Sequence, residues 1–424
     1  MTPTIPVGPE ARRLRFIFET KSGATPSSGV EEYWDGDINW VTPEDLGKLG
    51  DRYVRETRRR ITEEGYRNSA VSLALPGSIV LSKRAPIGQT AILAEPSTCN
   101  QGCFLLTRVN RVDERFYYYA LIHLRPALEA LGRGSTFMEL SADDLRSVPM
   151  PFPSQVDQQL IADYLDRELA RIDGLISEKE RMLALLEEKR AALISRTVTR
   201  GLDPKVPLKP SGQDWLGEIP VHWEVRTLKR SSSRIDTGTT PSASFMDGSL
   251  PSDFTWFTPS DFKHGGVITE SNRKIPQQAV DEGEAKVFPA HSLMVIGIGA
   301  TLGKVASSIA EFSANQQINV ITPSDSIRWD YLLYVLQGYE NVFSAHANSA
   351  TLPILNQERL GFIRVPVPPP AEQDAIVRKL NESRAAYTEV YRSLGDSTSL
   401  LKERRAALIS AAVTGQIPRE EITG

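Results

Sequence analysis

The segment that most resembles a catalytic motif is the run GIGATLGKV, which spans Gly297 to Val305. A phosphate-binding loop needs a glycine five positions before its last glycine and Ser or Thr directly after the lysine, because backbone N–H groups cradle the phosphates and the hydroxyl binds magnesium. Ile298 and Val305 occupy these two positions here. The run is therefore predicted to be a tight turn between two strands.

The two cysteines, Cys99 and Cys103, are spaced as the first half of a zinc site can be. The residues 215 positions further along the chain are Ala314 and Ile318, so buried free thiols are the better interpretation. The five histidines form no H-x-x-x-H pair. We find no G-x-S-x-G nucleophile elbow and no adenine methyltransferase motif either. No catalytic residue and no metal ligand is predicted.

A repeat with an offset of about 215 positions runs through the whole chain. The octapeptide EKRAALIS at 188–195 returns as ERRAALIS at 403–410. The run WVTP at 40–43 returns as WFTP at 256–259, and Asn100-Gln101 returns as Asn315-Gln316. The chain is therefore predicted to hold two copies of one unit, each with roughly 150 mixed residues followed by a long helical stretch.

Short apolar runs between turn residues make up the front part of each copy. Strands are predicted over 77–83 and 103–109 in the first copy, and over 292–298 and 318–322 in the second. Apolar residues at helical spacing predict helices over 115–124 and 329–337. These elements predict a compact α/β or α+β module, without defining its topology.

The back part of each copy is predicted to be an extended proline segment followed by a long helix. Gly201 and Gly415 are expected to end the helices, and Gly174 and Gly395 are candidate bends within them. Each helix carries an apolar seam of heptad type, which must pack on a neighbouring domain or, as we favour, on the other helix. The seam residues are Leu165, Ile172, Leu186, Leu193, Leu380, Tyr387, Leu394, Leu401 and Leu408.

Composition adds few limits to this picture. The chain has 424 residues, a net charge of −4 and a pI of about 5.9, which does not exclude a basic face for nucleic acid. The first residues lack the apolar core of a secretory signal, and no apolar run is long enough to span a bilayer. A cytoplasmic protein without disulfides is expected.

Several paired segments together resemble the specificity subunit of type I restriction-modification enzymes, over essentially the full length of the chain. The segments are GDINWVTPEDL and FTWFTPSDF, GSIVLSKRAPIGQTAI and VIGIGATLGKVA, CNQG and ANQQ, the proline segments, both RAALIS helices, and WLGEIPVHWEV. The resemblance implies an α+β fold with two similar α/β target-recognition domains, separated by two long antiparallel coiled-coil helices in a pseudo-two-fold repeat. The expected divisions are recognition domain 1 at 1–150, proline segment and central helix at 151–201, linker at 202–225, recognition domain 2 at 226–365, proline segment and C-terminal helix at 366–415, and tail at 416–424.

The resemblance also implies a function. Each recognition domain would read one half of a bipartite, asymmetric site in double-stranded DNA, and the helices would set the unread spacer and carry two methyltransferase subunits. Restriction and translocase subunits would join them, and AdoMet, ATP and magnesium would belong to these partners, leaving this chain non-catalytic and without a cofactor. Two alternatives stay open, namely part of a fused restriction-methylation enzyme and a coiled-coil scaffold that binds only protein.

Candidate DNA-binding residues are basic and polar side chains in turns and in one dense basic run, since such side chains contact phosphates and base edges. Ordinary exposed turns, a solvated helix face and helix caps are the competing interpretations. In the first copy the candidates are Arg52, Arg55, Arg58, Arg59, Arg60, Lys83, Arg84, Gln89, Thr90, Ser135 and Thr136. In the second copy they are Lys263, His264, Arg273, Lys274, Thr301, Lys304, Ser349 and Thr351.

Overall fold

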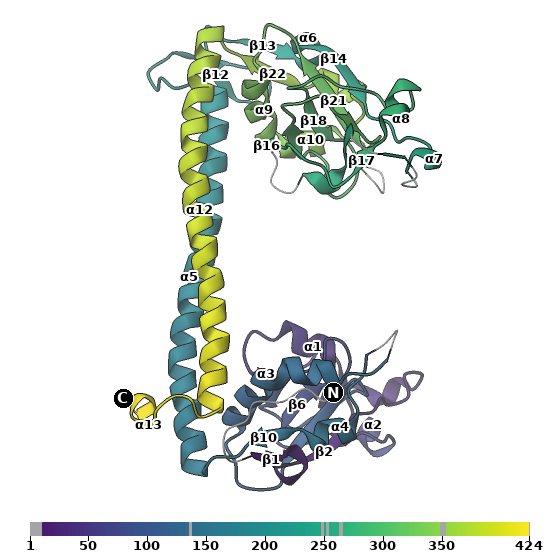
Figure 1. Ribbon diagram of the computed structural model, residues 1–424, viewed down its shortest axis with the longest axis vertical. Coiled ribbons are helices and arrows are strands. Elements are labelled where there is room, and N and C mark those ends of the chain that lie inside the picture. The colour runs from purple at the N-terminus through teal and green to yellow at the C-terminus, as the bar shows by residue number, and fades with distance from the viewer. Residues whose placement is uncertain are drawn as a thin grey trace. The chain divides into compact units, whose positions relative to one another are not determined.

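A computed structural model of the chain describes residues 11–134, 138–246, 250–251, 254–262, 266–347 and 353–423. The chain forms two compact units, one of Met1–Glu180 with Gly395–Gly424 and one of Arg181–Leu394. Each unit combines an α/β part with a portion of the two long helices, α5 (Gln155–Arg200) and α12 (Pro370–Val413) (Figure 1).

Two sheets make up the α/β part of the first unit. The five-stranded sheet has the order β2 (Phe18–Ser22), β9 (Cys103–Arg108), β6 (Ile79–Ser82), β7 (Thr90–Leu93) and β4 (Tyr53–Val54), and only the β4–β7 pair is parallel. The three-stranded sheet has the order β5 (Arg60–Ile61), β3 (Trp34–Val41) and β8 (Ser97–Cys99), with β3 parallel to β8. Short helices α1 (Pro43–Lys48), α2 (Glu63–Arg67) and α4 (Ala142–Ser147) and the 3-10 turns Leu14–Phe16 and Glu31–Tyr33 connect them.

Helix α3 (Glu114–Leu131) packs on the five-stranded sheet and confirms the helix predicted at 115–124. The Asp113 carboxylate begins the helix by accepting hydrogen bonds from the N–H groups of Arg115 and Phe116, at 2.9 and 3.1 Å. Its apolar face then joins the strands in one buried cluster, whose members include Phe116, Tyr117, Leu121, Leu124, Ile79, Leu81 and Leu106. Burial of this face, more than helix propensity, stabilises the element.

The second unit repeats this topology strand for strand. Its five-stranded sheet has the order β14 (Ser232–Thr237), β21 (Ile318–Pro323), β18 (Leu293–Ile296), β19 (Val305–Ser307) and β16 (Gly266–Val267), and its three-stranded sheet has the order β17 (Lys274–Ile275), β15 (Phe254–Phe257) and β20 (Ser313–Ala314). Helix α9 (Trp329–Gln337) takes the place of α3. The predicted α+β class and internal repeat are therefore confirmed. The shorter elements are α6 (Leu228–Ser231), α7 (Ala243–Met246), α8 (Gln277–Asp281), α10 (Glu340–His346), α11 (Gln357–Phe362) and the 3-10 turn Pro259–Asp261.

Each proline segment is a short strand that enters a long helix. β10 (Pro149–Pro151) pairs with β1 (Ala11–Arg13), and β22 (Arg364–Val367) pairs with β13 (Glu224–Thr227), both antiparallel. The long helices contain 46 and 44 residues and run without interruption through Gly174 and Gly395. Gly201 and Gly415 follow their ends with a φ of 73° in each case, the left-handed geometry that favours glycine after a helix.

Within each unit the two long helices pack antiparallel. In the first unit Lys402 pairs with Glu180 at 3.0 Å and Arg405 pairs with Asp173 at 2.7 Å, so the chain directions are opposite. The seam residues of this unit are buried (Leu165, Ile172) or packed against the same core (Leu401, Leu408). In the second unit Leu380 is buried, Leu193 packs against its cluster, and Leu186, Tyr387 and Leu394 are half-buried.

The segment between the repeats is anchored rather than free. Its strands β11 (Leu208–Pro210) and β12 (Glu218–Pro220) pair with each other. Trp223 is fully buried and donates from Nε1 to the Glu372 carboxylate at 2.9 Å, while Trp215 packs edge-on against Tyr339. The last element, α13 (Arg419–Thr423), follows α12 in the first unit. Among the helices described, none combines the length and apolar character needed to cross a bilayer.

Candidate nucleic-acid interface

The recurring motif W-x-T-P caps a short helical turn at the end of the central strand of each three-stranded sheet. Thr42 and Asp45 form a reciprocal capping box at the start of α1, with the Thr42 N–H donating to Asp45 Oδ2 at 2.9 Å. Thr258 and Asp261 repeat it, with an N–H to Oδ2 distance of 2.8 Å. The proline follows the cap at the first helical position, where its missing N–H is not needed.

The second oxygen of each aspartate holds the loop that leads into the neighbouring strand. Asp45 Oδ1 accepts the N–H of Arg58 at 3.2 Å, and Asp261 Oδ1 accepts the N–H of Asn272 at 3.1 Å. Residues 57–61 and 271–275 are therefore the same loop in the two units. The sequence shows this motif as a repeat, but local sequence does not predict that it positions this loop.

The basic run from Arg52 to Arg60 is not a helix face. It contains β4, an irregular turn and the start of β5. Most of its arginines are paired with carboxylates of the same unit: Arg52 with Asp166, Arg55 with Asp51 at 2.6 Å, Arg58 with Glu44 at 3.4 Å and Arg60 with Glu56 at 3.5 Å. Such pairing neutralises much of the positive potential that the sequence indicates.

Arg59 differs from the other arginines of this run. Its guanidinium lies over the ring of Trp34, 3.6 Å from the centroid, and 5.6 Å from the ring of Trp40. The two tryptophans pack edge to face at 5.0 Å, and each is nearly buried. Within the described part of the chain Arg59 has no carboxylate partner, so its charge is exposed on a rigid aromatic base.

Lys83 and Arg84, two predicted DNA contacts, both pair with the carboxylate of Glu139. Lys83 Nζ lies 2.9 Å from Glu139 and Arg84 Nε lies 3.0 Å from it. Hydrogen bonding from Lys83, with a further bond from Arg84, holds the pKa of Glu139 below its ordinary value. The Lys83 side chain is only 13% exposed, so it would have to leave Glu139 to reach DNA.

The other candidates differ in how much the structure says of them. Thr90 donates its hydroxyl to the Gly88 carbonyl at 3.2 Å, and Gln89 Oε1 is buried. In the second unit Thr301 and Lys304 are half-buried, while Arg273 and Lys274 are exposed. Six candidates lie outside the described residues, namely Ser135, Thr136, Lys263, His264, Ser349 and Thr351.

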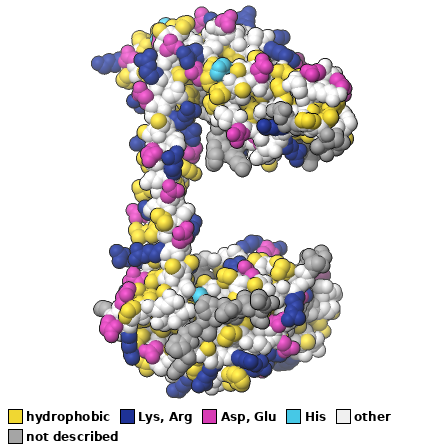
Figure 2. All heavy atoms as spheres, in the orientation of Figure 1, with side chains coloured by type: hydrophobic (Ala, Val, Ile, Leu, Met, Phe, Trp, Pro, Cys, Tyr) yellow, Lys and Arg dark blue, Asp and Glu magenta, His cyan; other side chains and the backbone are white. Residues whose placement is uncertain are grey.

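On the side in view (Figure 2), the described residues form no single basic face. Figure 2 shows Lys and Arg side chains interspersed with Asp and Glu over both units on the side in view. Individual unpaired cations, rather than a broad positive patch, are therefore the best candidates for contacts with phosphate.

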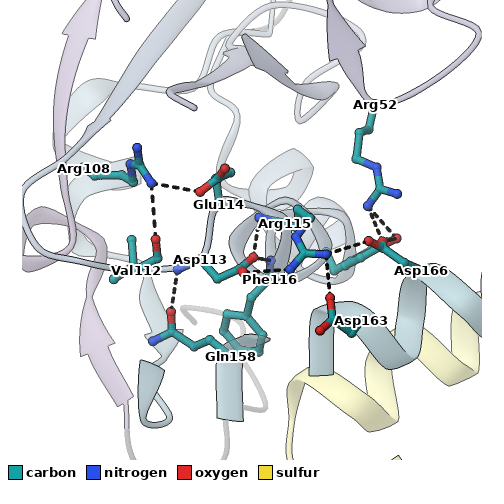
Figure 3. Close-up of polar contacts among 11 residues, drawn as sticks. Arg52, Arg108, Val112, Asp113, Glu114, Arg115, Phe116, Gln158, Asp163 and Asp166 are labelled. Carbon is teal, nitrogen blue, oxygen red and sulfur yellow. Dashed lines mark hydrogen bonds and ion pairs between the residues drawn. The ribbon is translucent and has the colours of Figure 1, made fainter. Parts of the chain in front are cut away.

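A polar network fastens the α/β part of the first unit to α5 (Figure 3). Arg115 reaches from the start of α3 to Asp163 at 2.7 Å and to Asp166 at 3.0 Å. Asp166 also accepts a hydrogen bond from the Tyr119 hydroxyl at 2.6 Å and pairs with Arg52. Arg52, a predicted DNA contact, thus forms an ion pair with a carboxylate of α5. None of these long-range partners is visible in local sequence.

The second unit has a corresponding network with different charges. Tyr334, the counterpart of Tyr119, donates to the amide oxygen of Asn381 at 2.8 Å. Arg328 stands where Asp113 stands in the first unit, and it pairs with Asp374 at 2.7 Å. The tyrosine contact with the long helix thus recurs at the same positions in the two units, whereas the ion pairs use different positions.

Both cysteines are free and buried, as predicted. Burial raises the pKa of the Cys99 thiol to about 12, which keeps it protonated. Among the described residues no three His, Cys, Asp or Glu side chains are grouped as a metal site would require.

Comparison with known proteins finds a consistent set of relatives. A family model described as type I restriction modification DNA specificity domain matches residues 6–181 and again residues 220–388. The type I restriction enzyme MjaIX specificity subunit of Methanocaldococcus jannaschii is 28% identical over 429 residues, covering 99% of this chain and 95% of that protein. The EcoBI specificity subunit of Escherichia coli is 20% identical over 356 residues, covering 81% of this chain and 74% of that protein.

One solved structure shares the fold along almost all of the chain. It is a chain from work on complex assembly and conformational transition of the type I R-M system, with a TM-score of 0.73 and 16% sequence identity. The similarity covers 98% of this chain and 100% of that one. At this identity the likeness concerns the fold alone.

Proposed function

The chain belongs to the type I restriction modification DNA specificity family, and from that premise we propose that it is the non-catalytic subunit that reads a bipartite, asymmetric DNA site, one half per recognition domain. The observation that carries the proposal is the strand-for-strand repetition of one α/β module within a single chain. Two similar modules with different surface side chains suit a ligand whose two halves have the same backbone and different bases.

The long helices are proposed to set the length of the unread spacer between the half-sites. Their continuity over 46 and 44 residues supports this role, since an uninterrupted helix has a defined rise of about 1.5 Å per residue. Direct interhelical ion pairs and a buried apolar seam resist sliding of one helix along the other. Helices that set a fixed spacer length need this resistance to sliding.

The same helices are proposed to carry two methyltransferase subunits on equivalent faces. Leu175 and Leu400 are exposed in the first unit, at 41% and 64%. The matching residues of the second unit, Val390 and Leu185, are exposed at 47% and 53%. Large apolar side chains left exposed at matching positions of a repeat suit two copies of one protein partner. Restriction and translocase subunits would complete the complex.

The chemistry is proposed to reside on these partners. AdoMet would bind the methyltransferase subunits, and ATP with magnesium would bind the translocating subunits, while this chain supplies position and sequence choice. The complex would act in the cytoplasm, where its DNA substrate lies.

The test is a reconstitution with a domain exchange. The chain is purified alone and together with the methyltransferase encoded beside its gene, and methylated adenines are mapped on genomic DNA. We expect methylation only from the complex, at a two-part motif. Replacing residues 1–150 with a foreign recognition domain should change one half of the motif and leave the other half unchanged. Methylation by the lone chain, or an unchanged motif after the exchange, would contradict the proposal.

A further inference from the structure

Arg59 and Arg273 occupy the same position in the two units. In both, the preceding loop residue is bound by the capping aspartate, Asp45 or Asp261. The carbonyl of each arginine accepts the N–H of the motif tryptophan, Trp40 or Trp256, at 3.4 Å. The next residues, Arg60 and Lys274, pair with Asn39 and Thr255 at matching places in the three-stranded sheets.

The charge of each arginine is available to a ligand. Both side chains are exposed, and among the residues the structure describes neither forms an ion pair with a carboxylate. The neighbours of Arg59 in the chain, Arg58 and Arg60, are paired with Glu44 and Glu56. Arg59 is therefore the arginine at this end of the run whose charge no described carboxylate offsets.

The loop geometry prepares the arginines for binding. A backbone held at both ends by the aspartate and the tryptophan leaves little loop entropy to lose when a ligand binds. For Arg59 the stacking on Trp34 also limits the motion of the side chain, which remains exposed to solvent. A planar guanidinium with several donors matches a phosphate group.

Arginine occurs at this position in both modules, and this recurrence favours contact with phosphate over reading of bases. Two modules that read different half-sites should differ at the positions that touch base edges, whereas the phosphate backbone is the same in every sequence. The residues that flank the arginines differ between the two copies of the repeat. Asn272 corresponds to Arg58, and Lys274 corresponds to Arg60. Arg59 and Arg273 alone stay constant within this exposed part of the loop.

We propose that Arg59 and Arg273 are matched phosphate contacts, one per recognition domain, which seat the DNA backbone in the same register on both modules. The inference rests on the proposed function, since it requires each domain to bind DNA. Base choice is then left to side chains around them that differ between the modules.

The experiment uses the full chain in complex with its methyltransferase. Arg59→Ala, Arg273→Ala and the double variant are compared with Arg67→Ala, which removes an exposed arginine already paired with Glu63 at 3.0 Å. Binding to a duplex with the mapped motif and to a scrambled duplex is measured over a series of salt concentrations. Each test variant should weaken both duplexes about tenfold and reduce the slope of log affinity against log salt by about 1, and the double variant by about 2. Arg67→Ala should match the wild type.

The outcomes separate this inference from the proposed function. Wild-type salt slopes in the variants, with normal binding by the parent complex, would overturn the phosphate assignment and leave the proposed function standing. A changed methylation motif in either variant would show base reading and overturn it as well. Absence of any DNA binding by the parent complex would overturn both. Among the residues that the structure describes, Arg273 stacks on no aromatic ring, so its variant also controls for instability, and thermal unfolding of each variant should match the parent.

Discussion

Gln158 and Gln373 make the same pair of hydrogen bonds at the start of the two long helices. Gln158 accepts from the Asp113 N–H at 2.9 Å and donates to the Pro153 carbonyl at 2.9 Å. Gln373 accepts from the Arg328 N–H at 2.8 Å and donates to the Pro368 carbonyl at 2.9 Å. Each buried carboxamide thereby joins a proline segment, a long helix and the start of the helix on the sheet.

Removing either glutamine should destabilise the chain, because the buried N–H and carbonyl that it satisfies lose their partner. We expect Gln158→Ala and Gln373→Ala each to lower the free energy of unfolding by about 1–3 kcal/mol in chemical denaturation. Gln159→Ala is the matched control, since Gln159 is adjacent and exposed, and it should change stability by less than about 0.5 kcal/mol. Equal effects at 158 and 159 would contradict the anchoring role.

Asp166 should matter more than Asp163 for holding the first α/β part to α5. Asp166 contacts Arg52, Arg115 and Tyr119, whereas Asp163 contacts Arg115 from an exposed position. Asp166→Asn is expected to cost about 1–3 kcal/mol, because the partly buried Arg52 loses its carboxylate partner and Arg115 loses one of its carboxylate partners. Asp163→Asn should cost less than about 1 kcal/mol. Hydrogen exchange of α3 reports whether the loss is local to this contact.

The seam between the long helices should depend on apolar packing more than on its ion pairs. Ile172→Ala removes a buried side chain and is expected to cost about 2–4 kcal/mol. Asp173→Ala breaks the exposed pair with Arg405 and should cost about 1 kcal/mol or less, with a smaller effect at high salt. A larger loss at Asp173 in thermal unfolding would reverse this ranking.

The exposed leucines should control partner stoichiometry. Leu175→Glu with Leu400→Glu should remove one methyltransferase subunit from the complex, and Leu185→Glu with Val390→Glu should remove the other, because a charge is costly in an apolar contact. Native mass spectrometry is expected to show one bound subunit for either pair and none for the combination. Two retained subunits in the combined variant would place the docking surface elsewhere.

The spacer should follow helix length. Inserting seven residues into both α5 and α12 keeps the heptad seam in register and adds about 10 Å, which corresponds to about three base pairs. The methylated motif should then keep both half-sites and gain a longer spacer. Insertion of four residues displaces the seam and should abolish assembly. A change in the half-site bases themselves would mean that the helices take part in reading.

Local patterns in the sequence determined the repeat and the elements within it. Strands β6, β9, β18 and β21 and helices α3 and α9 occur where apolar periodicity and turn residues placed them. The glycine within two residues of the end of each long helix also follows from local backbone preference. These features depend on residues close together in the chain, so the order of residues is enough to define them.

Only the tertiary structure decided which charges remain available. Arg52 pairs with Asp166, which is 114 positions away, and Arg84 pairs with Glu139, which is 55 positions away. Arg59 lies in the same basic run as Arg52 and stacks on Trp34 instead. A run of arginines has the same formal charge wherever it stands, but its potential depends on carboxylates that folding brings within hydrogen-bonding distance. Those distances are set by how distant strands and helices pack, which residue spacing alone does not define.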